Sequence, residues 1–298
     1  MVDIVSIGSV FIDDIVYPDG RTQMGVLGGG PIHAACGMVI WDERPGLCVT
    51  IGADTVDAIL PRLSTHCDTE GIVVVDLPQI RAWQVFEHDG TRHEILRVKE
   101  IEPYMTGPAP EQLPAAWGED PTLYMVLAGG DFLRWHMTYP HTDIIWEPNQ
   151  YYITETREHD MLDLLPMVDV ISPNLSEARA MFGPLSPDAI VHKMLSAGAR
   201  VVVLRMGADG SLVATRSTPR PIYVPAVPVA HIVDVTGAGN VYNGAFTVAW
   251  RRTGDALIAA RWGAVAASFS LESEGLVNLD RPDLIAERDR RLAWLESQ

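Results

Sequence analysis

Apolar runs of strand length alternate along the chain with stretches of helical periodicity. Strands are expected at residues 2–8, 47–51, 122–128, 143–147, 168–172 and 200–205. Helices are expected at residues 31–41, 55–65, 155–165, 175–182, 187–198, 240–252, 255–270 and 282–296. Because strands that alternate with helices build parallel sheets covered on both faces, the pattern predicts an α/β fold with a mostly parallel central sheet.

Residues 80–98 have a different pattern, with two extended runs around His88-Asp89-Gly90. A Gly-containing turn between extended runs is typical of a β-hairpin. We expect this hairpin and the early segment 10–27 to form a small β-layer apart from the main sheet. The sequence contains no internal repeat, low-complexity tract or clear linker, so residues 1–298 are expected to form one domain.

Composition narrows the classes of function. The 298 residues are 47% hydrophobic, enough for a sizeable core, and 22 Lys+Arg against 39 Asp+Glu give a net charge of −17. Such an acidic surface argues against non-specific binding to nucleic acid or to anionic membranes. The sparse cysteines Cys36, Cys48 and Cys67 form no metal-binding spacing and fit a reducing cytoplasm. No signal peptide or membrane span is expected from the sequence.

The most informative stretch places Gly237-Ala238-Gly239 directly before an apolar, helix-compatible segment. Such a turn can aim backbone N–H groups and the positive end of a helix at one point, which favours an anion. A Gly-x-Gly alone also occurs in ordinary turns. A dinucleotide fingerprint fits poorly, because the stretch comes late in the chain and its third glycine is too far on.

Four further segments carry candidate chemistry, and each has a simpler structural interpretation. Asn174 with Glu177 is typical of a capping box. Asp13 and Asp14 follow a strand and could both be solvated charges. His33 follows three glycines at a helix start, where a histidine is more often a structural partner. Arg205 precedes the Gly207-x-x-Gly210 loop and is as well suited to a salt bridge as to a phosphate.

In their order along the chain, these motifs resemble those of the ribokinase-like (pfkB) family of carbohydrate and nucleoside kinases. The resemblance implies a ribokinase-like three-layer sandwich whose small β lid is formed by about residues 10–27 and 80–100. It further implies Mg²⁺ and ATP as cofactors, a small sugar or nucleoside-like substrate, a cytoplasmic location and a possible homodimer through the lid.

The resemblance also implies roles for individual residues. The family's phosphoryl-binding turn corresponds to Gly237, Ala238 and Gly239, and its catalytic position corresponds to Asn240. Substrate-binding positions correspond to Asp13, Gly29, Gly30 and His33. Nucleotide-binding positions correspond to Asn174, Arg205, Gly207, Gly210 and Thr236, with Glu177 organising Mg²⁺.

Two positions depart from the family pattern. Asn240 stands where the family has an aspartate that acts as the catalytic base, and His33 stands where an asparagine is common. One hypothesis is a kinase in which Asn240 orients the acceptor hydroxyl, assisted by Asp13 or His33. The other is a kinase-like nucleotide or metabolite sensor, or an enzyme repurposed for another reaction. Replacing Asn240 with aspartate is expected to raise phosphoryl transfer if only the base is missing, since a general base contributes about 10²–10⁴-fold.

Overall fold

The structure is a computed structural model that describes the chain except residues 1, 89–91, 127–128 and 149–152. Within that part of the chain, a nine-stranded sheet has the order β13-β12-β11-β10-β9-β8-β1-β4-β5. Its strands are β1 (Ile4–Ser9), β4 (Gly46–Gly52), β5 (Val73–Val75), β8 (Thr122–Met125), β9 (Ile144–Trp146), β10 (Val170–Ile171), β11 (Val201–Arg205), β12 (Ser211–Thr215) and β13 (Ile222–Val224). All neighbours are parallel except β11 with β12 and β12 with β13, which confirms the predicted mostly parallel sheet.

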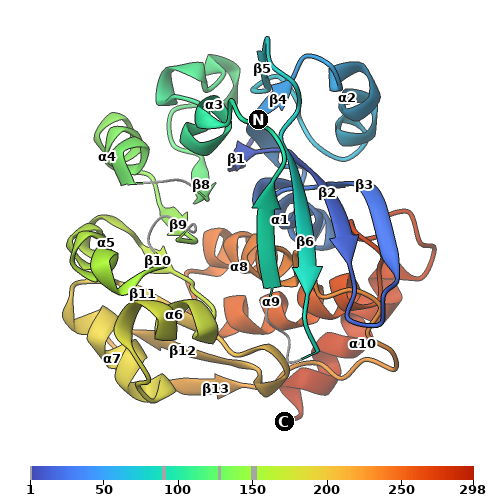
Figure 1. Cartoon of the computed structure of the whole chain (residues 1–298). Helices are drawn as coiled ribbons and strands as arrows, with labels where there is room; N and C mark the ends of the chain where they lie inside the picture. Colours follow the sequence, from blue (N-terminus) through green and yellow to red (C-terminus); the bar gives the residue numbers. More distant parts are fainter. Residues whose placement is uncertain (1, 89–91, 127–128, 149–152) are drawn as a thin grey trace.

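Helices cover both faces of this sheet. One face carries α1 (Gly30–Ile40), α8 (Ala238–Thr253), α9 (Ala256–Leu271) and α10 (Leu284–Glu296), and the other carries α4 (Gly129–Thr138), α5 (Glu158–Leu164), α6 (Leu175–Phe182) and α7 (Pro187–Ser196). Successive strand residues point to opposite faces, so Ile4 joins the first core and Val5 the second. The fold is therefore the expected three-layer α/β sandwich (Figure 1).

A second, four-stranded sheet lies apart from the main one. Its order is β3 (Thr22–Gly28), β2 (Phe11–Val16), β6 (Arg81–Phe86) and β7 (Arg92–Leu96). Figure 1 shows β2, β3 and β6 side by side, away from the strands of the main sheet. The strands β6 and β7 pair antiparallel, as a hairpin requires, while the predicted turn residues Asp89 and Gly90 lie outside the described residues.

The remaining elements are short. They are α2 (Val56–Ser64), α3 (Glu102–Thr106), η1 (Pro110–Gln112), η2 (Ala115–Trp117), η3 (Glu155–Arg157), η4 (Leu165–Met167) and η5 (Gly207–Asp209). The helix expected at 155–165 is divided between η3 and α5. The hydrophobic pattern did not predict α3, α4, β5, β12 or β13, most of which are too short to show a clear period.

The site is positioned by the close packing of α1 on α8. A Cβ at Gly244 would overlap the backbone carbonyl of Ala34, so only glycine allows this approach of the two helices. Gly30 lies beside the side chain of Asn240, and His33 lies beside Gly237. The N-termini of α1 and α8 consequently meet at the edge of the sheet where the parallel strands β1, β8 and β9 end, which is where ligands bind in such folds.

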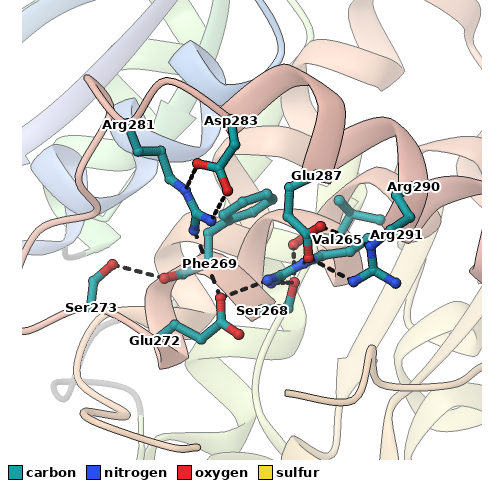
Figure 2. A network of polar contacts seen from close by, with 10 residues as sticks. All are labelled: Val265, Ser268, Phe269, Glu272, Ser273, Arg281, Asp283, Glu287, Arg290 and Arg291. Carbon is teal, nitrogen blue, oxygen red and sulfur yellow. Dashed lines mark hydrogen bonds and ion pairs between the residues drawn. The ribbon is translucent and has the colours of Figure 1, made fainter. Parts of the chain in front are cut away.

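A network of charged side chains around the buried Arg291 joins α10 to α9 (Figure 2). The guanidinium of Arg291, only 4% exposed, donates to Ser268 at 2.7 Å, to Glu272 at 2.6 Å and to Glu287 at 2.7 Å. A buried arginine is tolerated when its charge and donors are paired in this way. The network holds the C-terminal helix against the helix on which α8 packs. Among the described residues, no helix combines the length and hydrophobicity needed to cross a lipid bilayer.

Candidate functional site

A cavity of about 710 Å³ opens where α1 and α8 begin, with strands of the second sheet along its other side. Eleven of the residues predicted from the sequence line it: Asp13, Gly29, Gly30, His33, Asn174, Glu177, Arg205, Thr236, Gly237, Gly239 and Asn240. Three predicted residues, Ala238, Gly207 and Gly210, are not in its wall. Gly207 and Gly210 instead form the turn that connects β11 with β12, where the N–H of Met206 donates to the carbonyl of Gly210 at 2.8 Å.

The start of α8 has the geometry of an anion site. Gly237 is its N-cap with φ of 74°, a left-handed conformation that glycine adopts without strain. The first helical hydrogen bond runs from the N–H of Val241 to the carbonyl of Gly237 at 2.9 Å. The N–H of Ala238 donates to the carbonyl of Val235 at 3.4 Å, whereas the N–H groups of Gly239 and Asn240, with the positive end of the helix, are available to an anion in the cavity.

Beside this helix start lies a carboxylate that the sequence analysis did not select. Glu147 follows β9 and is 8% exposed. Its Oε2 accepts from the Tyr124 hydroxyl at 2.6 Å, from Asn240 Nδ2 at 2.9 Å and from Asn243 Nδ2 at 2.6 Å, while Oε1 accepts from Arg205 at 2.8 Å. The signal that would have found it is a polar residue at the carboxyl end of an expected strand, the edge at which α/β proteins bind ligands.

These contacts determine how Asn240 is oriented. Its Nδ2 donates to the Tyr124 hydroxyl at 3.0 Å and to Glu147 at 2.9 Å. Because an ionised carboxylate only accepts hydrogen bonds, the amide nitrogen must face Glu147, and the amide oxygen is left for the cavity. Burial, reinforced by the charge of Glu147, raises the pKa of Tyr124 well above its ordinary value, so this hydroxyl keeps its proton.

Arg205 brings a buried cation to the same place. It is 8% exposed and also donates to the carbonyl of Ser172 at 2.8 Å. Its guanidinium lies against Gly239, where a Cβ would overlap it. Its Nε is buried without a hydrogen-bond partner in the described part of the chain. The helix start and Arg205 thus bring N–H donors to one end of the cavity, where the Arg205 charge is paired with Glu147.

Asn174 and Glu177 form the capping box expected from the sequence. The Asn174 side chain accepts from the N–H of Glu177 at 2.9 Å, and Glu177 accepts from the N–H of Asn174 at 2.8 Å. Burial raises the pKa of Glu177, an effect that nearby Arg205 opposes and Glu147 reinforces. Glu177 nevertheless lines the cavity, so its two interpretations, helix cap and ligand contact, are compatible.

The donor set fits a Mg²⁺ ion that arrives with phosphates. Mg²⁺ commonly takes one or two protein carboxylates and completes its shell with water and phosphate oxygens. Glu177 supplies such a carboxylate at the cavity wall. Within the described residues, no cluster of three or more His, Cys, Asp or Glu side chains is arranged to hold a metal by itself.

The second sheet contributes a buried carboxylate to the opposite side of the cavity. Asp13 is 4% exposed and accepts from Gln84 Nε2 at 3.0 Å, which also donates to Glu94 at 3.0 Å. Burial raises the pKa of Asp13 to about 6, although the Gln84 hydrogen bond lowers it. Neighbouring Asp14 lies outside the cavity wall, pairs with Arg97 and is also buried, so neither aspartate is a solvated charge.

His33 lies between the two sides of the cavity. The ring is 3% exposed and packs against Gly237. Its Nδ1 is buried and has no hydrogen-bond partner among the described residues. Burial lowers the pKa of His33 to about 4, partly offset by the charge of Asp234. The imidazole is therefore neutral at physiological pH and can donate or accept a hydrogen bond without carrying charge.

Comparisons with known proteins agree with this geometry. Residues 148–283 match the model of the pfkB family of carbohydrate kinases. A cytidine kinase of Thermococcus kodakarensis is 25% identical over 258 residues, covering 85% of this chain and 90% of the relative. An uncharacterized protein of Schizosaccharomyces pombe is 26% identical over 314 residues, covering 92% of this chain and 86% of the relative.

Solved structures show the same fold over nearly the whole chain. A Burkholderia thailandensis nucleoside kinase in complex with inosine superposes with a TM-score of 0.78 at 16% identity, covering 99% of each chain. Arabidopsis thaliana ribokinase complexed with ribose and ATP superposes with a TM-score of 0.76 at 19% identity, covering 98% of this chain and 99% of the other. Residues 148–283 therefore match the pfkB family of carbohydrate kinases, and the chain as a whole has the ribokinase-like fold.

Proposed function

We propose that this protein transfers a phosphoryl group from Mg²⁺-ATP to a hydroxyl of a small sugar or nucleoside-like metabolite. The observation that carries the proposal is one cavity with opposite ends of different chemistry. The start of α8 and the Arg205 guanidinium mark one end, the carboxylate of Asp13 marks the other, and His33 lies between them.

In this proposal, one set of residues binds the nucleotide and the transferring phosphoryl group. The N–H groups of the Gly237–Gly239 turn and the guanidinium of Arg205 stabilise the charge of the transferring phosphoryl group, the dominant requirement of phosphoryl transfer. Mg²⁺, held through Glu177 and water, neutralises phosphate charge when it is bound. Asn174, Thr236 and the Gly207–Gly210 turn belong to the nucleotide side, the turn contributing from outside the cavity wall.

The acceptor side orients the hydroxyl. Asp13 accepts hydrogen bonds from substrate hydroxyls, Gly29 and Gly30 let the backbone approach the substrate, and neutral His33 adds a donor or acceptor. The oxygen of Asn240 accepts from the reacting hydroxyl, whose oxygen bonds to the γ-phosphorus as the bond to the ADP oxygen breaks. Asn240 cannot take the proton, which passes to a phosphoryl oxygen of the product or to water. Such a late proton transfer is compatible with a loose transition state.

A nucleoside is the acceptor class that the cavity favours. Phe11, Phe86 and Tyr104 stand in its wall, and aromatic side chains offer faces on which a base can stack. The names of the cytidine kinase and the inosine-bound nucleoside kinase support the same class. We further propose that the four-stranded sheet acts as a lid over this end; a homodimer through it and a cytoplasmic location stay predictions.

The test is phosphoryl transfer by the purified protein with Mg²⁺-ATP and a panel of nucleosides, sugars and polyols, read by mass spectrometry. A phosphorylated nucleoside or sugar is expected, and its formation should stop when EDTA removes Mg²⁺. Calorimetric titration with Mg²⁺-ATP on the same sample separates the alternatives. ATP binding without any product would indicate the second hypothesis, a nucleotide or metabolite sensor or a repurposed enzyme, which the missing carboxylate at Asn240 favours. Absence of ATP binding would contradict the nucleotide site.

A further inference from the structure

Glu147 contacts both Asn240 and Arg205, two polar side chains beside the start of α8. Through Oε2 it orients the amide of Asn240, and through Oε1 it holds the guanidinium of Arg205. We infer that Glu147 is a positioning residue for phosphoryl transfer, and that Asn240 and Glu147 are a coupled pair in which one must be an amide while the other is a carboxylate. This inference rests on the proposed kinase function only where it concerns the rate of phosphoryl transfer.

The donor count supports the coupling. Three of the four groups around Glu147 are neutral donors, Tyr124, Asn240 and Asn243, and the fourth is a cation. A carboxylate in place of Asn240 would turn the donor at 2.9 Å into an acceptor. Two carboxylates at this distance cannot both ionise readily, so they share a proton. The Asn240→Asp variant therefore gains a carboxylate whose proton is retained near neutral pH, rather than a free base.

Glu147 itself is poorly suited to be that base. Four donors, one of them the Arg205 guanidinium, already occupy its two oxygens. Its oxygens are therefore engaged by these side chains rather than by a substrate hydroxyl. Its effect on the reaction runs through the atoms it orients, the Asn240 oxygen and the Arg205 guanidinium.

Other ionisable groups also surround the pair. Tyr124 contacts it from β8 and Arg205 from the end of β11. Glu177 on α6 lies 4.0 Å from the Arg205 guanidinium, and Arg92 on β7 interacts electrostatically with Glu177. Every variant below keeps these groups, so a pH effect that appears only when both carboxylates are present belongs to the pair.

The experiment compares Asn240→Asp, Glu147→Gln and the double variant, with Asn278→Asp as the matched control because Asn278 is exposed. Thermal unfolding is measured from pH 5 to pH 8. A shared proton in the folded state raises the affinity of the pair for protons above that of the unfolded chain. The stability of Asn240→Asp relative to wild type is therefore highest at pH 5 and falls as the pH rises. The double variant and Asn278→Asp are expected to lack this extra slope.

Phosphoryl transfer gives the second readout. At pH 7, the double variant is expected to exceed Asn240→Asp by about tenfold or more, because removing the charge of Glu147 frees the new carboxylate to act as a base. Glu147→Gln alone is expected to lower kcat by roughly 10-fold to 100-fold through misorientation of Asn240 and Arg205.

Two results would overturn the inference. One is an unfolding profile of Asn240→Asp parallel to that of Asn278→Asp, and the other is a rate for Asn240→Asp at pH 7 above both wild type and the double variant. If the pH-dependent unfolding is found but no protein transfers phosphate, the coupled pair stands and the kinase proposal fails. A further outcome is that the double variant folds while Asn240→Asp does not fold at any of the same pH values. That outcome would also support the coupling.

Discussion

Removal of the Arg205 cation is the sharpest test of how the site is held together. Arg205→Met keeps much of the length and apolar volume of the side chain but takes away its charge and its donors. The partner Glu147 is then left buried with a charge that no cation balances. The pair is desolvated on both sides, since the Arg205 and Glu147 side chains are 9% and 10% exposed at a separation of 2.8 Å.

The structure sets the expected magnitude. Breaking a buried ion pair from one side costs about 3–5 kcal/mol, because the remaining charge stays out of water without its partner. The neutral donors Tyr124, Asn240 and Asn243 still bind Glu147, so we expect a cost near the lower end, about 3 kcal/mol. The chain offers a matched exposed pair, Arg134 and Glu111 at 2.7 Å with side chains 56% and 60% exposed. Arg134→Met is expected to cost less than about 1 kcal/mol.

The assay is urea unfolding followed by tryptophan fluorescence, with the free energy of unfolding compared for each single variant and its double. The cycle of Arg205→Met with Glu147→Gln should give a coupling energy of about 2 kcal/mol or more. The cycle of Arg134→Met with Glu111→Gln should give less than about 0.5 kcal/mol. Equal costs for Arg205→Met and Arg134→Met would refute the reasoning, because they would mean that Glu147 is solvated or does not depend on Arg205.

The remaining predictions concern other parts of the cavity. With the pKa of Asp13 near 6 against an ordinary 3.8, its ionisation opposes folding by up to about 3 kcal/mol above pH 6 and by nothing below pH 4. Asp13→Asn should therefore unfold at a higher temperature than wild type at pH 8, and a gain that persists at pH 4 would contradict this. Gly239→Ala should cost about 1–3 kcal/mol in urea unfolding because its Cβ meets the Arg205 guanidinium, and clearly less in the Arg205→Met background. Glu177→Gln keeps an acceptor for the N–H of Asn174, so its melting temperature should stay near wild type while the Mg²⁺ concentration for half-maximal phosphoryl transfer rises about tenfold. An unchanged Mg²⁺ dependence would leave Glu177 as a helix cap alone.

Local patterns in the sequence determined most of the fold. The alternation of strands and helices gave the three-layer α/β sandwich, and Asn174 with Glu177 gave a helix start whose two capping bonds are present. The turn at Gly237 was recognised as a helix N-terminus for the same reason. These features depend on residues close together in the chain, so backbone geometry and capping chemistry are readable without knowledge of the tertiary structure.

The tertiary structure alone decided which distant side chains meet. Glu147 lies 93 positions before Asn240 and 58 before Arg205 in the chain, and its local sequence indicates only that it stands at the carboxyl end of an expected strand. The position of Glu147 among its partners depends on the order of β8, β9 and β11 in the sheet and on the approach of α8. Together these elements bring four donors to one carboxylate. The resemblance implied that Asn240 stands where the family has a base, and the packing of the sheet against α8 determined that this amide has a carboxylate to orient it.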